Sequence, residues 1–139
     1  MITYFDTSML MKLMIDEEAY RAEAEQLWLD SDYVACAEIG YTEARSALAA
    51  AQRHDRLNTA ALRTAREQFE LLWAQMSIVV VDTALVRAAG DVAEHDRLRG
   101  YDAVHLAAAI AGKATVMASA DRQLVDAARH RGLGGAGPS

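Results

Sequence analysis

The chain carries four short runs of apolar residues in which polar and apolar positions do not alternate. The runs cover residues 2–5, 33–36, 78–81 and 114–117. Strands that are hydrophobic on both faces are typical of a parallel sheet with helices packed on each side, because both faces are then buried. We therefore predict that these four runs are short strands of a parallel sheet.

The segments between these runs show the periodicity of helices. Residues 17–30 and 58–76 each place their apolar side chains in one stripe at helical spacing. Asp82 has the position of a helix N-cap, because apolar residues follow it at the same spacing. Residues 100–112 are apolar on nearly all sides, which predicts a buried helix. Strands that alternate with helices indicate an α/β fold with a central parallel sheet flanked by helices.

The composition fits one folded domain. Of the 139 residues, 53% are hydrophobic and 24% are charged, so the chain can bury a core and is not of the disordered class. We expect a single domain over residues 1–131. Residues 132–139 are rich in glycine and contain Pro138, and we expect them to form a flexible tail.

Cysteine usage and the length of the apolar runs exclude several classes of protein. Cys36 is the single cysteine of the chain, so internal disulfides and multi-cysteine zinc sites are excluded. No apolar run approaches the roughly 20 residues that a membrane-spanning helix needs, and no basic segment with a signal-peptide pattern opens the chain. We therefore expect a soluble, cytoplasmic protein that does not bind a membrane.

The net charge of −6 argues against a passive nucleic-acid-binding protein, which normally shows a basic surface. It does not exclude an enzyme that acts on nucleic acid and uses acidic residues as metal ligands. The positions of the acidic residues therefore matter more than their number.

Three aspartates follow predicted strands. Asp6 and Asp82 directly follow the first and third runs, and Asp121 lies just beyond the fourth. Ligands bind beyond the carboxyl ends of the strands in parallel α/β sheets, so each is a candidate site residue. Each is also in a position typical of a helix N-cap. Asp82 and Asp121 are followed by the same apolar pattern, so periodicity does not distinguish a cap from a site residue.

Two further acids share the apolar faces of predicted helices. Glu43 aligns with Ile39 and Ala47, and Asp102 aligns with Leu106. A carboxylate on such a face is costly unless it is paired or binds a metal. A salt bridge to an arginine is the alternative for Glu43.

His105 follows Asp102 by three residues and shares its helix face. This pair could be half of a carboxylate–histidine metal site. A core histidine that is hydrogen-bonded to a neighbour is the favoured interpretation, because the chain has one such pair and not two. Cys36 lies in a predicted strand, and we expect it to be an inert core residue.

Other α/β chemistries can be tested against the residues. The phosphate-binding P-loop and the dinucleotide-binding glycine pattern are both absent. A phospho-acceptor (receiver-like) signalling domain would use Asp6, Asp82 and a hydroxyl near Ser119. It would also need a lysine after a fifth strand, and no lysine follows Lys113.

Four segments, in order along the chain, resemble PIN-domain ribonucleases. They are Tyr4–Ser8 with Lys12, Tyr41–Leu48, Leu98–Ala109 and Ser119–Leu124. Leu98–Ala109 is the strongest match. The small size of the chain and this third segment are similar to VapC-type toxins of toxin–antitoxin pairs.

This resemblance implies that Asp6, Glu43, Asp102 and Asp121 form one acidic pocket that binds Mg²⁺ or Mn²⁺ and cleaves RNA. Such metals prefer oxygen ligands. We expect Asp6 and Asp102 to be direct metal ligands, and Glu43 and Asp121 to complete the catalytic set. Without these four acids the net charge would be −2. The hydroxyls of Thr7 and Ser119 are candidates to orient the ligands.

The resemblance also implies a sheet of four or five strands in which the first and fourth strands are central neighbours and the third lies at an edge. This order favours Asp121 over Asp82 as a site residue. A cognate antitoxin and a homodimer are implied as well. A catalytically inactive PIN-like binding module is an alternative, although all four acids are present.

Two features depart from the family pattern. The family often ends in a further short strand, whereas glycines follow Leu133 here. Basic residues for RNA contact are scattered along the chain, and the best candidates are Arg97, Arg99, Arg122, Arg129 and Arg131.

Overall fold

The computed structural model of the protein describes residues 1–15 and 19–138. The described residues form five strands and seven helices, which alternate along most of the chain. The strands are β1 (Ile2–Phe5), β2 (Tyr33–Ala37), β3 (Ser77–Val79), β4 (Val116–Ala118) and β5 (Gly134–Ala136). The helices are α1 (Thr7–Met14), α2 (Arg21–Asp30), α3 (Ile39–Arg53), α4 (Thr59–Gln75), α5 (Thr83–Asp96), α6 (Gly100–Ala111) and α7 (Arg122–His130).

The strands form one parallel sheet in the order β3-β2-β1-β4-β5. The predicted α/β fold with a parallel sheet is therefore confirmed, and so is the strand order implied by the family resemblance. Thr3 of β1 pairs with Val34 of β2 on one side and Val116 of β4 on the other. The amino-acid positions that follow β1 and β4 are thus neighbours, whereas the end of β3 lies at the sheet edge.

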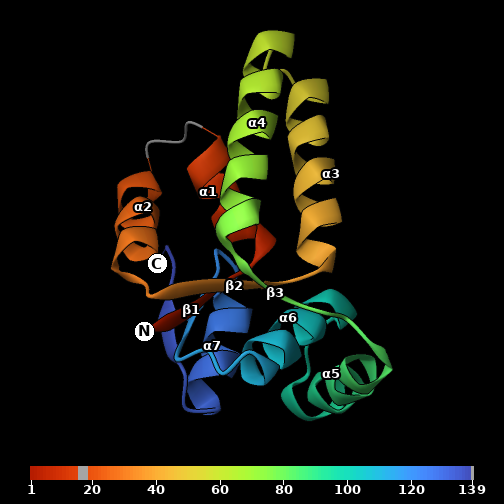
Figure 1. Cartoon of the computed structure of the whole chain (residues 1–139). Coiled ribbons are helices and arrows are strands. Elements are labelled where there is room, and N and C mark those ends of the chain that lie inside the picture. The colour runs from red at the N-terminus through yellow and green to blue at the C-terminus, as the bar shows by residue number, and fades with distance from the viewer. Residues whose placement is uncertain (16–18, 139) are drawn as a thin grey trace.

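Helices cover both faces of the sheet (Figure 1). Helices α1 to α4 lie on one side, and α3 and α4 project as a long hairpin; α5 to α7 lie on the other side. The central strand is buried over most of its length, because Tyr4 and Phe5 of β1 have no exposed surface. Leu106 of α6 and Met117 of β4 are equally buried. The apolar helix predicted at residues 100–112 is therefore α6.

The third and fourth strands are shifted relative to the predicted runs. Val80 is 58% exposed and belongs to the connection between β3 and α5, not to the predicted strand over residues 78–81. Lys113 has a positive φ of 58°, and the Ala114 N–H bonds to the carbonyl of Ala109 to close α6. The fourth strand consequently begins at Val116 and not at Ala114.

Helix α2 begins at Arg21, later than the start of the helical pattern predicted over residues 17–30. Residues 17 and 18 of that prediction lie outside the described residues. Tyr20, which precedes α2, has a positive φ of 70° and does not continue the helix toward the N-terminus. No helix of the described part of the chain is long and apolar enough to cross a membrane.

The prediction of a flexible tail over residues 132–139 is wrong, because part of this Gly-rich segment forms a strand. Gly134–Ala136 form β5, which pairs in parallel with β4. The Gly134 N–H donates to the carbonyl of Thr115, and the Ser119 N–H donates to the carbonyl of Ala136. Glycine permits this close approach, because a Cβ atom on Gly137 would overlap the carbonyl oxygen of Ser119. Ser139 of the predicted tail lies outside the described residues.

Candidate active site

Asp6 lies at the centre of the candidate site, directly after the central strand β1. Its side chain is buried and accepts three hydrogen bonds. Oδ1 accepts from Ser8 Oγ at 2.6 Å and from the Met9 N–H at 3.0 Å, and the latter bond caps α1. Oδ2 accepts from Ser119 Oγ at 2.5 Å. The N-cap interpretation and the site interpretation of Asp6 are therefore compatible.

Burial raises the pKa of Asp6, and the hydrogen bonds from Ser119 and Ser8 partly oppose this increase. A nearby positive charge stabilises the ionised form of a buried aspartate, so the position of Asp6 favours cation binding.

Two serines connect the loop after β4 with the start of α1. Ser119 Oγ accepts a hydrogen bond from the Asp121 N–H at 2.9 Å, and Ser8 Oγ accepts one from the Ala120 N–H at 2.9 Å. Asp121 caps α7 by accepting from the Gln123 N–H. Ser119 thus links the carboxylate of Asp6 to the backbone of Asp121.

Glu43 reaches the site from α3. Its Oε1 accepts hydrogen bonds from Thr7 Oγ1 at 3.2 Å and lies 2.7 Å from Nε2 of His105. The side chain of Glu43 is 29% exposed, so it borders the solvent. Among the described residues the hydrogen-bond partners of Glu43 are Thr7 and His105, so the alternative of an arginine partner is not favoured.

Asp102 lies in the first turn of α6, and Arg99 links it to Asp121. The distance from Arg99 Nε to Asp102 Oδ2 is 3.5 Å, and that from Arg99 Nη2 to Asp121 Oδ2 is 3.7 Å. The pKa of Asp102 is raised, first by partial burial and second by the negative charge of Asp121, while Arg99 opposes the shift. Asp102 and Asp121 are therefore close enough to repel each other.

Shared neighbours connect all four predicted acids. Ser119 joins Asp6 to the Asp121 backbone, and Arg99 joins Asp121 to Asp102. His105 contacts Glu43 and lies close enough to Asp6 and Asp102 to affect the pKa of each. The four predicted acids are Asp6, Glu43, Asp102 and Asp121.

These acids are not gathered into a ready-made metal cage. Within residues 1–15 and 19–138, no group of three or more His, Cys, Asp or Glu side chains is arranged to hold a metal ion. The chemistry of the donors nevertheless fits Mg²⁺ or Mn²⁺, because all are carboxylates and two of them repel each other. Mg²⁺ commonly binds through one or two carboxylates together with water and substrate phosphate, so it does not require such a cage.

Asp82 does not belong to this set of acids. It is exposed, follows the edge strand β3, and caps α5 by accepting a hydrogen bond from the Leu85 N–H at 2.9 Å. Strand β2 separates β3 from β1 in the sheet. A phospho-acceptor site that combines Asp82 with Asp6 is therefore not favoured.

His105 and Cys36 are core residues, as predicted. His105 is 3% exposed and is hydrogen-bonded through both ring nitrogens. Cys36 is fully buried, and burial raises the pKa of its thiol. Neither side chain is available to solvent for ligand binding.

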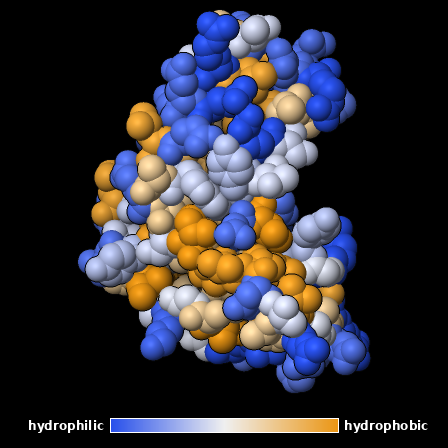
Figure 2. Space-filling model, turned by 45° about the vertical axis from the view of Figure 1, so that its right-hand side comes forward, coloured by the Kyte–Doolittle hydropathy of each residue, from blue (hydrophilic) through white to orange (hydrophobic). Residues whose placement is uncertain are grey.

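A groove of about 660 Å³ borders the acidic site. It is lined by Thr7, Ile39, Thr42, Glu43, Ser46, Ala47, Ala50 and Tyr101. Figure 2 shows that the molecule is hollowed between the α3–α4 hairpin and the part that carries α5 and α6. Tyr101 is 70% exposed and directly precedes Asp102. Sequence reasoning missed Tyr101, although an aromatic residue beside a candidate site acid is a usable signal.

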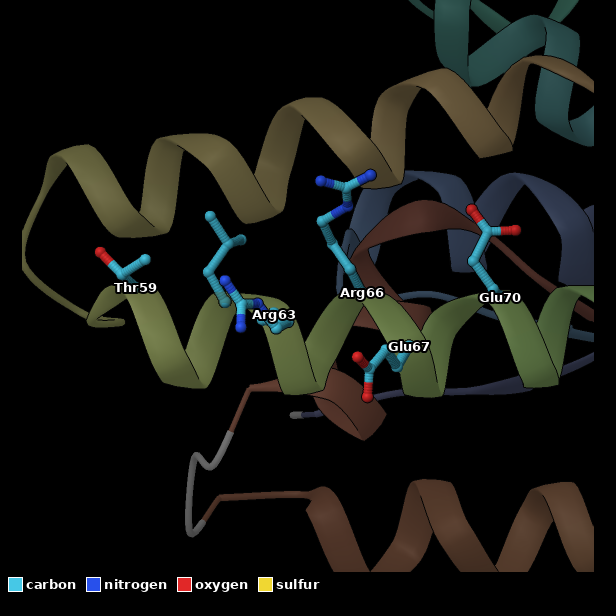
Figure 3. Close-up of a pocket in the computed structure, with 6 residues that line it drawn as sticks. Thr59, Arg63, Arg66, Glu67 and Glu70 are labelled. Atoms are coloured by element: carbon cyan, nitrogen blue, oxygen red, sulfur yellow. The ribbon is translucent and has the colours of Figure 1, made fainter.

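A second depression, of about 400 Å³, lies along α4 (Figure 3). It is lined by Thr59, Leu62, Arg63, Arg66, Glu67 and Glu70, all from this one helix. None of the four candidate acids lines it. It therefore contributes nothing to the acidic site.

The predicted RNA-contacting arginines differ in their surroundings. Arg131 makes two hydrogen bonds of 2.7 Å to Asp96, and Arg129 donates to the carbonyl of Gly135. Arg97 follows the last residue of α5 and caps it with a positive φ of 56°, and Arg122 begins α7. Arg99 is the one of the five that bridges two of the candidate acids.

Comparisons with known proteins identify the family of this chain. The model of the PIN domain family matches residues 3–130. Ribonuclease VapC45 from Mycobacterium tuberculosis (strain CDC 1551 / Oshkosh) is 37% identical over 125 residues, which is 88% of this chain and 86% of that protein.

Solved structures show the same fold at lower identity. The M. tuberculosis toxin VapC20, which cleaves the sarcin–ricin loop, has a TM-score of 0.68 and 19% identity, and the match covers 90% of this chain and 94% of that one. A toxin–antitoxin complex from Klebsiella pneumoniae has a TM-score of 0.62 and 18% identity, with 86% of each chain covered. The chain belongs to the PIN domain family and, within it, to the VapC proteins.

Proposed function

We propose that this protein is an Mg²⁺- or Mn²⁺-dependent endoribonuclease that acts as a toxin and is neutralised by a cognate antitoxin. The observation that carries the proposal is the link from Asp6 through Ser119 to Asp121 at the carboxyl ends of β1 and β4. The proposal is also supported by the similarity to Ribonuclease VapC45, which is 37% identical to this chain. This kinship with a ribonuclease does not favour an inactive binding module.

In this proposal Asp6 and Asp102 hold the metal directly, and Glu43 and Asp121 complete the pocket. A bound divalent metal would act as a Lewis acid that neutralises the negative charge developing on the scissile phosphate. The carboxylates are suited to this ion because they are hard oxygen donors.

The residues of the chain have separate roles in this proposal. Ser8, Ser119 and the Met9 N–H fix both oxygens of Asp6. Thr7 and His105 both contact Oε1 of Glu43, and we infer that its Oε2 accepts a proton or a hydrogen bond from the attacking water. A general base must lie within hydrogen-bonding reach of the proton that it removes.

Arg99 and Tyr101 are suited to substrate binding. The Arg99 side chain is 82% exposed beside Asp102 and Asp121, so it can exchange these partners for a backbone phosphate. Tyr101 presents an exposed ring in the groove next to Glu43. Exposed aromatic rings stack on the bases of single strands and loops, which favours unpaired RNA as the substrate class.

The partner proteins and the location are also proposals. One of the structural neighbours is a toxin–antitoxin complex, and the fold similarity supports an antitoxin partner for this chain. We further expect a homodimer in the cytoplasm. Light scattering of the purified protein tests the dimer: twice the mass of the single chain is expected, and the mass of one chain would contradict it.

The activity is tested by incubating the purified chain with total RNA, with and without Mn²⁺, and mapping the cut ends. We expect cleavage that EDTA stops and that leaves 5′-phosphate and 3′-hydroxyl ends, the products of in-line attack by water with the 3′ oxygen as the leaving group. The Asp6→Asn variant, purified in the same way, controls for contaminating nucleases. Cyclic phosphate ends, or cleavage that persists in EDTA, would contradict the metal-dependent mechanism.

A further inference from the structure

A chain of buried hydrogen bonds runs from the backbone of β2 to the carboxylate of Glu43. The Ala37 N–H donates to Tyr4 Oη at 2.9 Å. Tyr4 Oη lies 2.6 Å from Nδ1 of His105, and Nε2 of His105 lies 2.7 Å from Oε1 of Glu43. Tyr4 has no exposed surface and His105 is 3% exposed, so water does not compete for these bonds.

The groups at the two ends of this chain can each bond in one direction only. An amide N–H can only donate, so Tyr4 Oη is the acceptor of its bond with Ala37. A carboxylate can only accept, so Nε2 of His105 carries the hydrogen in its bond with Glu43. In the neutral ring Nδ1 then accepts the hydroxyl hydrogen of Tyr4. Each donor in the chain therefore has an acceptor.

A competing acceptor for the Tyr4 hydroxyl exists. The thiol of Cys36 interacts with Tyr4, since each side chain influences the pKa of the other. Sulfur is a weak acceptor compared with an imidazole nitrogen, and the distance of 2.6 Å to Nδ1 is that of a strong hydrogen bond. The imidazole is therefore the better partner for this hydroxyl.

We propose that His105 is a positioning residue that holds Glu43 through its Nε2–H tautomer, and that the Tyr4 hydroxyl, which accepts the Ala37 N–H of β2, supports this tautomer by donating to Nδ1. His105 and Thr7 then supply two donors to one oxygen of Glu43, which fixes the orientation of the carboxylate. Asp102 and His105, one turn apart on α6, thus serve the same site differently. One is a candidate ligand, and the other orients a second acid. The effect of His105 on catalysis rests on the proposed function, whereas the tautomer of His105 does not.

The tautomer of the wild-type protein is tested by NMR of ¹⁵N-histidine-labelled protein at one fixed pH. We expect His105 to show an unprotonated Nδ1 and a protonated Nε2. Cys36→Ala, which removes the competing sulfur, should leave this pattern unchanged. A His105 ring that is protonated on Nδ1 would overturn the proposal, whether or not the protein cleaves RNA.

The positioning role is tested with variants at two positions. His105→Leu removes both hydrogen bonds and should lower kcat by about 10- to 100-fold with little change in KM, the range seen when support of a metal-site ligand is lost. His105→Gln can accept from Tyr4 and donate to Glu43, so it should recover most of kcat. Tyr4→Phe should lower kcat less than His105→Leu does, because it leaves the bond between His105 and Glu43 in place.

Folding is monitored by circular dichroism and thermal melting, and the midpoint of Mn²⁺-induced stabilisation gives a readout other than cleavage. If His105→Leu does not fold, the positioning role is tested by comparing the kcat of the wild type with that of His105→Gln and Tyr4→Phe. A folded His105→Leu or Tyr4→Phe variant with wild-type kcat would overturn the positioning role. Failure of the wild type to cleave RNA would instead overturn the proposed function, and the NMR result would be unaffected.

Discussion

Ser119 Oγ donates a 2.5 Å hydrogen bond to Oδ2 of Asp6, although the two residues are 113 positions apart in the chain. The bond is possible because β4 pairs directly with β1, so the two residues that follow these strands are neighbours. The same hydroxyl accepts the N–H of Asp121. A single serine therefore positions one acid of the site directly and another through its backbone.

The first prediction compares two aspartates with the same capping bond. Asp6→Asn should lower RNA cleavage by about two orders of magnitude, the scale on which single electrostatic contributions to catalysis are lost. Asp82→Asn should leave cleavage nearly unchanged and cost about 1 kcal/mol or less of stability. Both residues accept the N–H three positions later. Comparing the two variants therefore separates an effect on catalysis from an effect on helix capping. Initial rates on total RNA and urea unfolding provide the measurements.

The site assignment is wrong if Asp82→Asn abolishes cleavage while Asp6→Asn retains it. Asparagine is a good N-cap residue, so neither substitution should prevent folding. Loss of folding in Asp6→Asn would show that its three hydrogen bonds are needed mainly for stability.

The sequence pattern predicts local features of this protein better than contacts between distant segments. Apolar runs identified β1 and β2 because buried parallel strands are apolar on both faces. Periodicity could not decide between Asp82 and Asp121, since both cap a helix. Strand order favours Asp121, and strand order depends on pairing between distant segments.

The bond between His105 and Glu43 could not be predicted from spacing, because it joins residues 62 positions apart on two helices. The interpretation of His105 as a hydrogen-bonded core residue was correct, but its partner was unknown. The strand β5 was missed for a different reason. Glycine has low strand propensity, so Gly134–Ala136 resemble a loop until the pairing with β4 is known.

The second prediction tests whether β5 supports the site. Gly137→Ala should destabilise the protein by about 1–3 kcal/mol, because the added Cβ would overlap the carbonyl oxygen of Ser119. Cleavage should fall as well, since Ser119 positions Asp6. Gly90→Ala in α5 is the matched control: a Cβ there meets no atom within 4 Å, and the change should stabilise by about 0.5–1 kcal/mol. Thermal melting and cleavage rates of both variants check this. Equal stability of Gly137→Ala and wild type would argue that residue 137 is loosely held.

The third prediction concerns the exposed ring of Tyr101. Tyr101→Ala should raise KM for single-stranded RNA by roughly 5- to 150-fold, because stacking contributes about 1–3 kcal/mol per base. Tyr101→Phe should keep a nearly normal KM. Tyr33 is 61% exposed at the start of β2, at the opposite end of the strands, so Tyr33→Ala is the control. Equal effects of Tyr101→Ala and Tyr33→Ala on KM would exclude a specific stacking role.

The fourth prediction is that Asp102→Asn stabilises the metal-free protein at pH 7. Burial and the charge of Asp121 raise the folded-state pKa of Asp102 above 3.8, so ionisation of this group disfavours the fold at pH values above that raised pKa. The penalty disappears as the pH falls below 3.8, and the advantage of the variant should shrink in the same direction. The ion pair with Arg99 offsets little of this penalty, because the arginine is 82% exposed. Urea unfolding between pH 4 and pH 8 measures the difference.

Divalent metal should stabilise the wild-type protein, because a cation replaces the repulsion between Asp102 and Asp121 with attraction. At ten times Kd, Mn²⁺ should add about 1.4 kcal/mol of stability and raise Tm by roughly 3–6 °C. The increase should grow from pH 5 to pH 8, because protons compete with the metal for the carboxylates. Asp102→Asn should shrink it. Asp126→Asn, which changes an exposed acid that pairs with Arg129, should not. If Mn²⁺ leaves the wild-type Tm unchanged and Asp102→Asn is less stable than wild type without metal, then Asp102 serves as a partner of Arg99 and not as a metal ligand.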